Sequence, residues 1–123
     1  MAKTVLVTGA SAGIGKATAI LLAQNGYNVY GAARRTEKMY DLRNYGIKPI
    51  ALDITSEESI VNCVQQITNE AGTIDILVNN AGFGSSGAVE DLSIDDARYQ
   101  LEVNLFGAMR LTQLVLPKMR ANK

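Results

Sequence analysis

The chain has 123 residues and is 47% hydrophobic, which is enough for one domain, residues 1–123, with a core of its own. Its 12 lysines and arginines balance 12 aspartates and glutamates, and no apolar run approaches the ~18 residues of a membrane span, so we expect a cytoplasmic protein that binds neither nucleic acid nor membranes. The lack of histidine and the single cysteine, Cys63, argue against intrachain disulfides, histidine-based acid–base catalysis and most zinc sites, so we predict no bound metal.

Short aliphatic runs alternate with longer segments of helical period, as in a parallel sheet covered by helices. We predict strands over residues 3–8, 28–33, 49–52 and 74–79, the last of them apolar enough to be buried on both faces. The first intervening helix begins near Gly13 and ends at Asn25-Gly26, the second covers residues 36–45, and the third opens with a capping box of Thr55 and Glu58. The residues that we expect these helices to bury are Ile14, Ala17, Leu21 and Leu22 in the first and Ile60, Val64, Ile67 and Ala71 in the third.

The last predicted helix covers residues 93–119 and is apolar on two adjoining sides. Its apolar positions include Ala97, Tyr99, Leu101, Val103, Leu105, Phe106, Ala108, Thr112 and Val115. A helix with so wide an apolar surface usually packs against two layers. This chain supplies only one such layer.

A glycine-rich segment, residues 8–15, joins the first predicted strand to the first helix. Gly9 permits a tight turn, Gly13 lets a ligand approach the backbone, and Gly15 lets the helix lie close to the strand. Amides at the start of the helix then face the turn and favour a pyrophosphate. Glycine triplets also occur in loops for structural reasons, but the strand before and the helix after this one favour a dinucleotide site. No Gly-Lys-Ser/Thr sequence follows, which argues against a P-loop and nucleotide hydrolysis.

Residues 8–15 resemble the hallmark Thr-Gly-x-x-x-Gly-x-Gly of the short-chain dehydrogenase/reductase family. A second family hallmark, Asn-Asn-Ala-Gly, matches Asn79-Asn80-Ala81-Gly82 after the fourth predicted strand. The resemblance spans essentially the whole chain and corresponds to the N-terminal half of the family. It implies an α/β fold, a Rossmann-type doubly wound parallel sheet of about four strands in the order 3-2-1-4 with flanking helices, which ends before the family's fifth strand.

Ligands of such a sheet bind beyond the carboxyl ends of the strands, where the glycine loop, Asp53 and the asparagine motif all fall. The resemblance implies that Asp53 contacts the adenine, with Ile54 beside it, and that Asn104 is a catalytic asparagine. The cofactor-binding residues that we expect are Gly9, Ser11, Gly13, Ile14, Gly15, Arg34, Arg35, Asp53, Ile54, Asn80, Ala81 and Gly82. Structural interpretations stay open: Asp53 also suits a turn or helix cap before Thr55, and the asparagines suit a strand-end turn.

The choice of cofactor depends on the end of the second strand, where NAD-binding members carry an acid for the ribose hydroxyls. Here the sequence is Ala32-Ala33-Arg34-Arg35. Two guanidiniums can pair with a 2′-phosphate and no carboxylate repels it, so we favour NADP over NAD. A solvated basic turn is the structural alternative. Some family members also carry a basic residue before the second glycine, whereas this chain has Ala12.

The family's chemistry needs a serine and a tyrosine followed four residues later by a lysine, and none of the five tyrosines has a lysine at that position. We therefore interpret the chain as the NADP(H)-binding half of an oxidoreductase that would transfer hydride between nicotinamide and a small carbonyl or alcohol substrate. Two alternatives stay open: a stand-alone dinucleotide-binding module, and a self-assembling structural fragment without catalysis. We expect Ser85 and Ser86 to lie in a solvated loop rather than to touch a substrate.

The resemblance also bears on assembly, because the family's fourth strand is interior and its last helix joins a subunit interface. In this chain one edge of that strand and much of the last helix would be exposed. We therefore expect self-association through the fourth-strand edge and the last helix.

Overall fold

The computed structural model describes residues 2–84 and 87–123, so the expectation for Ser85 and Ser86 lies outside the described residues. The strands are β1 (Thr4–Thr8), β2 (Asn28–Ala33), β3 (Lys48–Ala51) and β4 (Ile76–Val78). The helical elements are α1 (Gly13–Gln24), the 3-10 helix η1 (Thr36–Tyr45), α2 (Glu57–Ala71), the 3-10 turn η2 (Val89–Asp91), α3 (Ile94–Leu101), the π-helical segment η3 (Glu102–Phe106) and α4 (Gly107–Asn122). The predicted alternation of strands and helices is confirmed.

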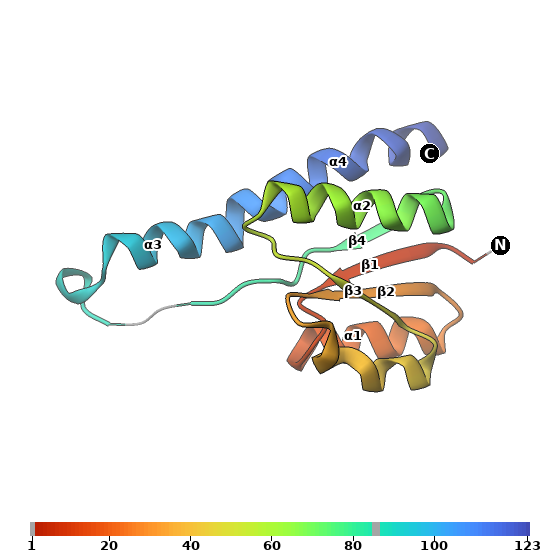
Figure 1. The fold of residues 1–123 in the computed structure, drawn as a ribbon, viewed down its shortest axis with the longest axis horizontal. Helices are drawn as coiled ribbons and strands as arrows, with labels where there is room; N and C mark the ends of the chain where they lie inside the picture. Colours follow the sequence, from red (N-terminus) through yellow and green to blue (C-terminus); the bar gives the residue numbers. More distant parts are fainter. Residues whose placement is uncertain (1, 85–86) are drawn as a thin grey trace.

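The four strands form one parallel sheet in the order β3-β2-β1-β4, as the resemblance implied. Helices α1 and η1 cover one face, while α2 and α4 cover the other (Figure 1). Because side chains alternate across a strand, β1 sends Leu6 into the core beneath α2 and α4, and Val5 and Val7 into the core beneath α1 and η1. β1 is therefore buried along its whole length. At the sheet edge, β4 pairs only with β1 among the described strands, and its side chains are half-buried, so the prediction that this strand is buried on both faces is wrong.

The face that α1 buries differs from the predicted one. Ile14 is 78% exposed, Leu21 is 61% exposed and Ala17 is exposed, whereas Gly15 and Ala19 are buried. Of the predicted positions, only Leu22 packs against the core, and it is partly buried. A β-carbon at Gly15 would collide with the Gly9 carbonyl oxygen, so only glycine at this position lets α1 lie this close to the loop. This close approach fixes the rotation of the helix and turns Ile14 outward. The predicted helix end is confirmed, since Gly26 follows with a φ of +89°.

Of the predictions about the other helices, one is confirmed and one needs correction. Residues 36–45 are helical as predicted and have 3-10 geometry, and the buried residues, Met39 and Leu42, are three apart as that geometry requires. The predicted capping box at Thr55 is wrong, because Ser56 caps α2 by accepting a hydrogen bond from the Ser59 amide at 3.2 Å. The apolar stripe of α2 is buried as predicted, and Cys63 lies within it. Burial raises the pKa of the Cys63 thiol to about 12, which suits a packing residue.

The last predicted helix is present, but its π-helical segment interrupts the α-helical geometry. Its buried positions are Val103, Gly107, Leu111 and Val115. Ala108 and Thr112 are partly buried, whereas the predicted apolar positions before Gly107 other than Val103 are exposed, because α3 extends past the end of the sheet (Figure 1). We call α3, η3 and the first turn of α4, residues 94–110, the arm. Over the described residues, no helix combines the length and apolarity that crossing a membrane requires, and the cytoplasmic location stays a prediction.

Candidate functional site

Hydrogen bonds to the hydroxyl of Thr8 link the glycine loop to the asparagine motif. Thr8 ends β1 and is 1% exposed. Its Oγ1 accepts hydrogen bonds from the amides of Asn80 and Ala81, both at 2.9 Å, and donates to the Val78 carbonyl at 3.3 Å. A buried hydroxyl with three partners fixes the carboxyl ends of β1 and β4 against each other. The two family hallmarks thus form one rigid unit.

The three glycines of the loop have different structural reasons to be glycine. Gly9 has a φ of +64°, and a β-carbon there would lie 3.0 Å from the side chain of Asn80, whose Nδ2 donates to the Gly9 carbonyl at 3.3 Å. Gly15 is the point of contact between helix and loop described above. Gly13, with a φ of +59°, faces open space instead, since no heavy atom lies within 4 Å of a β-carbon built there. The space that a ligand would need is therefore present at the start of α1.

The start of α1 also differs from the starts of α2 and α3. Ser56 and Ser93 cap those two helices with their side chains, and acidic residues occupy their first turns. Helix α1 begins after Ala12, which makes no side-chain cap, and has no acidic residue in its first turn. Its first amides consequently keep their hydrogen-bonding capacity and their partial positive charge for an anion.

A cleft of about 430 Å³ opens beside this unit, beyond the carboxyl ends of the strands. It is lined by Thr8, Gly9, Ala32, Ala33, Arg34, Leu52, Asp53, Ile54, Thr55, Ala81, Gly82, Phe83, Tyr99 and Val103. Six of the expected cofactor-binding residues, Gly9, Arg34, Asp53, Ile54, Ala81 and Gly82, thus meet in one cleft. Apart from Arg34 and Asp53, its walls are uncharged and mostly aliphatic or aromatic, which suits a flat heterocycle.

Asp53 has the structural role that its sequence position suggested, and it lines the cleft as well. Its Oδ1 accepts hydrogen bonds from the Thr55 hydroxyl at 2.7 Å and the Thr55 amide at 3.0 Å. These hydrogen bonds, together with the positive charge of Arg34, hold the pKa of the Asp53 carboxyl below its usual value. Asp53 is therefore an ionised, fixed hydrogen-bond acceptor at the cleft wall.

A second, basic hollow of about 380 Å³ adjoins the end of β2. It is lined by Ser11, Ala33, Arg34, Arg35 and Lys38. Arg34 lines both this hollow and the cleft, so the two lie side by side. Sequence reasoning missed Lys38. It lies in η1, three residues after the N-cap Arg35, and this spacing of two basic residues could have indicated it. Three cations around one hollow favour a compact anion.

Asn104 lies in the π-helical segment and holds the loop that follows the asparagine motif. Its Oδ1 accepts from the Phe83 amide at 2.9 Å, and its Nδ2 donates to the Phe83 carbonyl at 2.6 Å. Single turns of π-helix are frequent at functional sites, because the extra residue redirects the side chains around it. Neither Asn104 nor the remaining expected residues, Ile14, Gly13, Gly15 and Asn80, line the cleft. Phe83 and Tyr99 do line it, and sequence reasoning missed both.

Comparison with known proteins agrees with this geometry. The family model described as short chain dehydrogenase matches residues 3–123. The chain belongs to the short-chain dehydrogenase family. A 3-ketodihydrosphingosine reductase from Bacteroides thetaiotaomicron is 38% identical over 117 residues, which cover 94% of this chain and 42% of the reductase.

Solved structures show the same relationship. A short-chain dehydrogenase from Streptomyces avermitilis has a TM-score of 0.96 and 41% identity, covering 99% of this chain and 46% of its own. L-sorbose reductase from Gluconobacter frateurii, in complex with NADPH and L-sorbose, has a TM-score of 0.90 and 29% identity, covering 98% of this chain and 49% of its own. The chain thus spans about half the length of the short-chain dehydrogenases that it matches.

Proposed function

We propose that this chain is the NADP(H)-binding half of a short-chain oxidoreductase that transfers hydride between nicotinamide and a carbonyl or alcohol substrate. The observation that carries the proposal is the basic hollow of Ser11, Arg34, Arg35 and Lys38 beside an uncharged cleft. This pair of sites suits an adenosine with a phosphate on its ribose. The NADPH complex of the similar L-sorbose reductase supports the same cofactor class.

Each part of the dinucleotide has a place that the chain's chemistry favours. The adenine fits the cleft, where Asp53 offers a fixed acceptor and Ile54, 8% exposed, gives an apolar surface. The pyrophosphate fits the uncapped start of α1, where Gly13 leaves the backbone accessible. The 2′-phosphate fits between the guanidiniums and Lys38, and Ser11 offers a hydroxyl there.

The chain's own residues bind and orient rather than transfer protons. The bound cofactor supplies or accepts the hydride. The carbonyl oxygen must also gain a proton, and the sequence has no tyrosine with a lysine four residues later to provide it. We therefore place the proton donor outside residues 1–123, and we propose that Asn104 is a positioning residue that acts through its hold on Phe83.

Calorimetric titration of the chain with NADPH and NADH tests this function. We expect saturation with both and a preference for NADPH of at least about tenfold, or ~1.4 kcal/mol. Replacing Arg34 and Arg35 together with alanine should remove the preference while leaving NADH binding in place. The change Arg43→Ala is a matched control, because Arg43 lies in η1 over the ring of Tyr40 and lines neither hollow. Lack of saturation with either dinucleotide would contradict the proposal.

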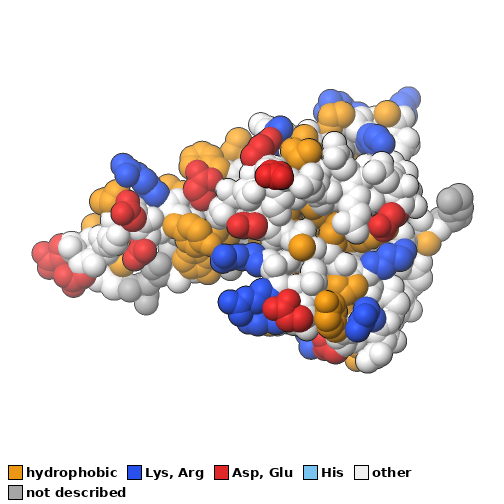
Figure 2. Space-filling view, viewed as in Figure 1, with side chains coloured by type: hydrophobic (Ala, Val, Ile, Leu, Met, Phe, Trp, Pro, Cys, Tyr) orange, Lys and Arg blue, Asp and Glu red, His pale blue; other side chains and the backbone are white. Residues whose placement is uncertain are grey.

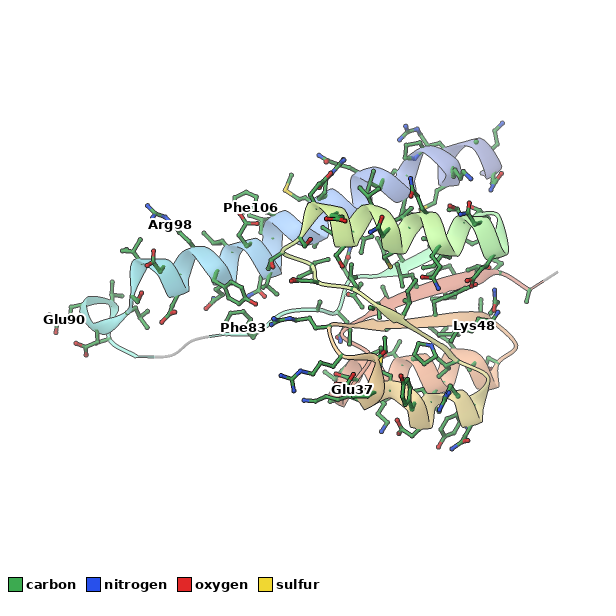
Figure 3. The ribbon with its side chains drawn as sticks, viewed as in Figure 1. Glu37, Lys48, Phe83, Glu90, Arg98 and Phe106 are labelled. Atoms are coloured by element: carbon green, nitrogen blue, oxygen red, sulfur yellow. The ribbon has the colours of Figure 1, made fainter. Side chains whose placement is uncertain are left out.

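We further propose that the chain self-associates through the arm and the free edge of β4. The arm exposes Leu101, Leu105, Phe106 and Met109, each between 45% and 50%, and Leu116, farther along α4, is 41% exposed. Figure 2 shows hydrophobic side chains gathered where the arm meets the body, and in Figure 3 Phe106 points away from the sheet. So much apolar surface favours a partner. Sedimentation velocity should show dimers or larger species that Leu105→Glu with Met109→Glu dissociates, and a monomer at high concentration would contradict the proposal.

A further inference from the structure

An interaction across the mouth of the cleft joins β2 to α3. Arg34, just beyond the end of β2, donates a hydrogen bond from Nη1 to the hydroxyl of Tyr99 at 3.4 Å. The ring of Tyr99 lies against that of Phe83, with centroids 5.6 Å apart and planes inclined at 40°. All three side chains line the cleft. The outer wall of the cleft thus consists of the rings of Phe83 and Tyr99 and ends at the guanidinium of Arg34. Phe83 lies between the helical arm and the sheet (Figure 3).

This wall is anchored, although its side chains are partly exposed. The backbone of Phe83 is held on both sides by the side chain of Asn104, at 2.9 and 2.6 Å. Phe83 in turn supports the ring of Tyr99. The Tyr99 hydroxyl therefore has a defined position opposite the end of β2. Because the Tyr99 hydroxyl accepts the hydrogen bond from Arg34, its fixed position restricts the positions that the Arg34 guanidinium can adopt.

Arg34 is the residue on which such a restriction matters most, because it lines both the cleft and the basic hollow. A guanidinium has five N–H donors in a planar fork, so the one bond to Tyr99 leaves others free for a phosphate. An unrestrained arginine would lose its rotamer freedom when it binds an anion, and a side chain already held in place avoids part of that cost.

We propose that Tyr99 is a positioning residue that sets the preference for 2′-phosphorylated dinucleotides by orienting Arg34; this inference rests on the proposed NADP(H)-binding function. The Tyr99 hydroxyl fixes the guanidinium between the two hollows, where it meets the ribose phosphate. The rings of Tyr99 and Phe83 contribute to binding NADPH and NADH alike, because both dinucleotides contain the same adenine.

The change Tyr99→Phe tests the inference, since it keeps the ring and removes only the hydroxyl. In calorimetric titrations of the full chain we expect NADPH affinity to fall about threefold while NADH affinity stays within about twofold. Tyr27→Phe is the matched control, because Tyr27 is a similarly exposed tyrosine just before β2, at the opposite end of that strand. Phe83→Leu should weaken both dinucleotides, because Phe83 lines the cleft, and should also reduce the NADPH preference, because its ring supports Tyr99.

A double-mutant cycle separates positioning from a general packing effect. In the Arg34→Ala background, Tyr99→Phe should cause no further loss of NADPH affinity, because the guanidinium that it orients is gone. An unchanged or increased NADPH preference in Tyr99→Phe, or an equal loss in both backgrounds, would overturn this inference alone. Failure of the unaltered chain to bind either dinucleotide would overturn the proposed function as well.

Discussion

The body of the molecule and its arm contain similar amounts of apolar sequence but differ in what covers it. In the body, β1 lies between two helical layers, and Leu111 of α4 is fully buried against it. In the arm, Leu105 lies only six positions before Leu111 and is 45% exposed. Apolar residues fewer than two helical turns apart therefore differ in burial, because one faces the sheet and the other faces away. An apolar pattern predicts that a surface will be covered, and the fold decides whether this chain covers it.

Matched leucine truncations test this contrast with the largest effect. We expect Leu111→Ala to lower the free energy of unfolding by about 2–5 kcal/mol, because it leaves a cavity under α4. Leu105→Ala should change it by no more than about 0.5 kcal/mol, because solvent already reaches that side chain. Urea denaturation at low protein concentration measures both. A loss at Leu105 that equals the loss at Leu111 would mean that the arm is covered in solution.

The second test concerns the junction between the two family hallmarks. Thr8→Val keeps the shape of the side chain but leaves the amides of Asn80 and Ala81 without their acceptor. We expect a loss of about 2–3 kcal/mol in the free energy of unfolding, since buried donors would be unsatisfied. Thr8→Ser retains the hydroxyl and should cost about 1 kcal/mol, the contribution of one buried methyl group. If valine and serine destabilise the chain equally, the hydrogen bonds of Thr8 do not hold the junction.

Sequence reasoning was most successful where function and fold depend on local pattern. Alternating elements predict the parallel sheet, the family resemblance implies its strand order, and motif positions place Gly9, Asp53 and Ala81 at one sheet edge. It failed where the outcome depends on how distant segments meet. The Arg34–Tyr99 bond joins residues 65 apart, and no local pattern indicates it. The outward rotation of Ile14 likewise depends on a contact between Gly15 and the loop.

The cofactor-binding roles themselves stay predictions, since proximity to the cleft does not test them. Six of the twelve expected residues line it, while Ser11 and Arg35 line the adjoining basic hollow instead. Side chains that are exposed at the wall of a cleft have no packing partner within the chain that a sequence pattern could encode. Phe83 and Tyr99, both 42% exposed, illustrate this point, because nothing in the sequence distinguishes them from other exposed aromatic residues. Only the fold shows that they form one wall.

The smallest expected effect is on the pH dependence of folding stability, through the carboxyl of Asp53 at the cleft wall. The pKa of Asp53 is lowered in the folded chain by hydrogen bonds from Thr55, so its ionised form contributes stability above the ordinary carboxyl value of about 3.9. That contribution is lost as the pH falls through the lower, folded-state pKa. Asp53→Asn should therefore flatten the fall of the urea midpoint at the acid end while leaving its slope near neutral pH unchanged. The matched control is Asp95→Asn, because Asp95 is an exposed aspartate of α3. Asp75→Asn is unsuitable, because Asp75 accepts a hydrogen bond from the Thr4 amide at 2.7 Å. An acid limb that keeps its shape in Asp53→Asn would show that the bonds to Thr55 do not favour the ionised carboxylate.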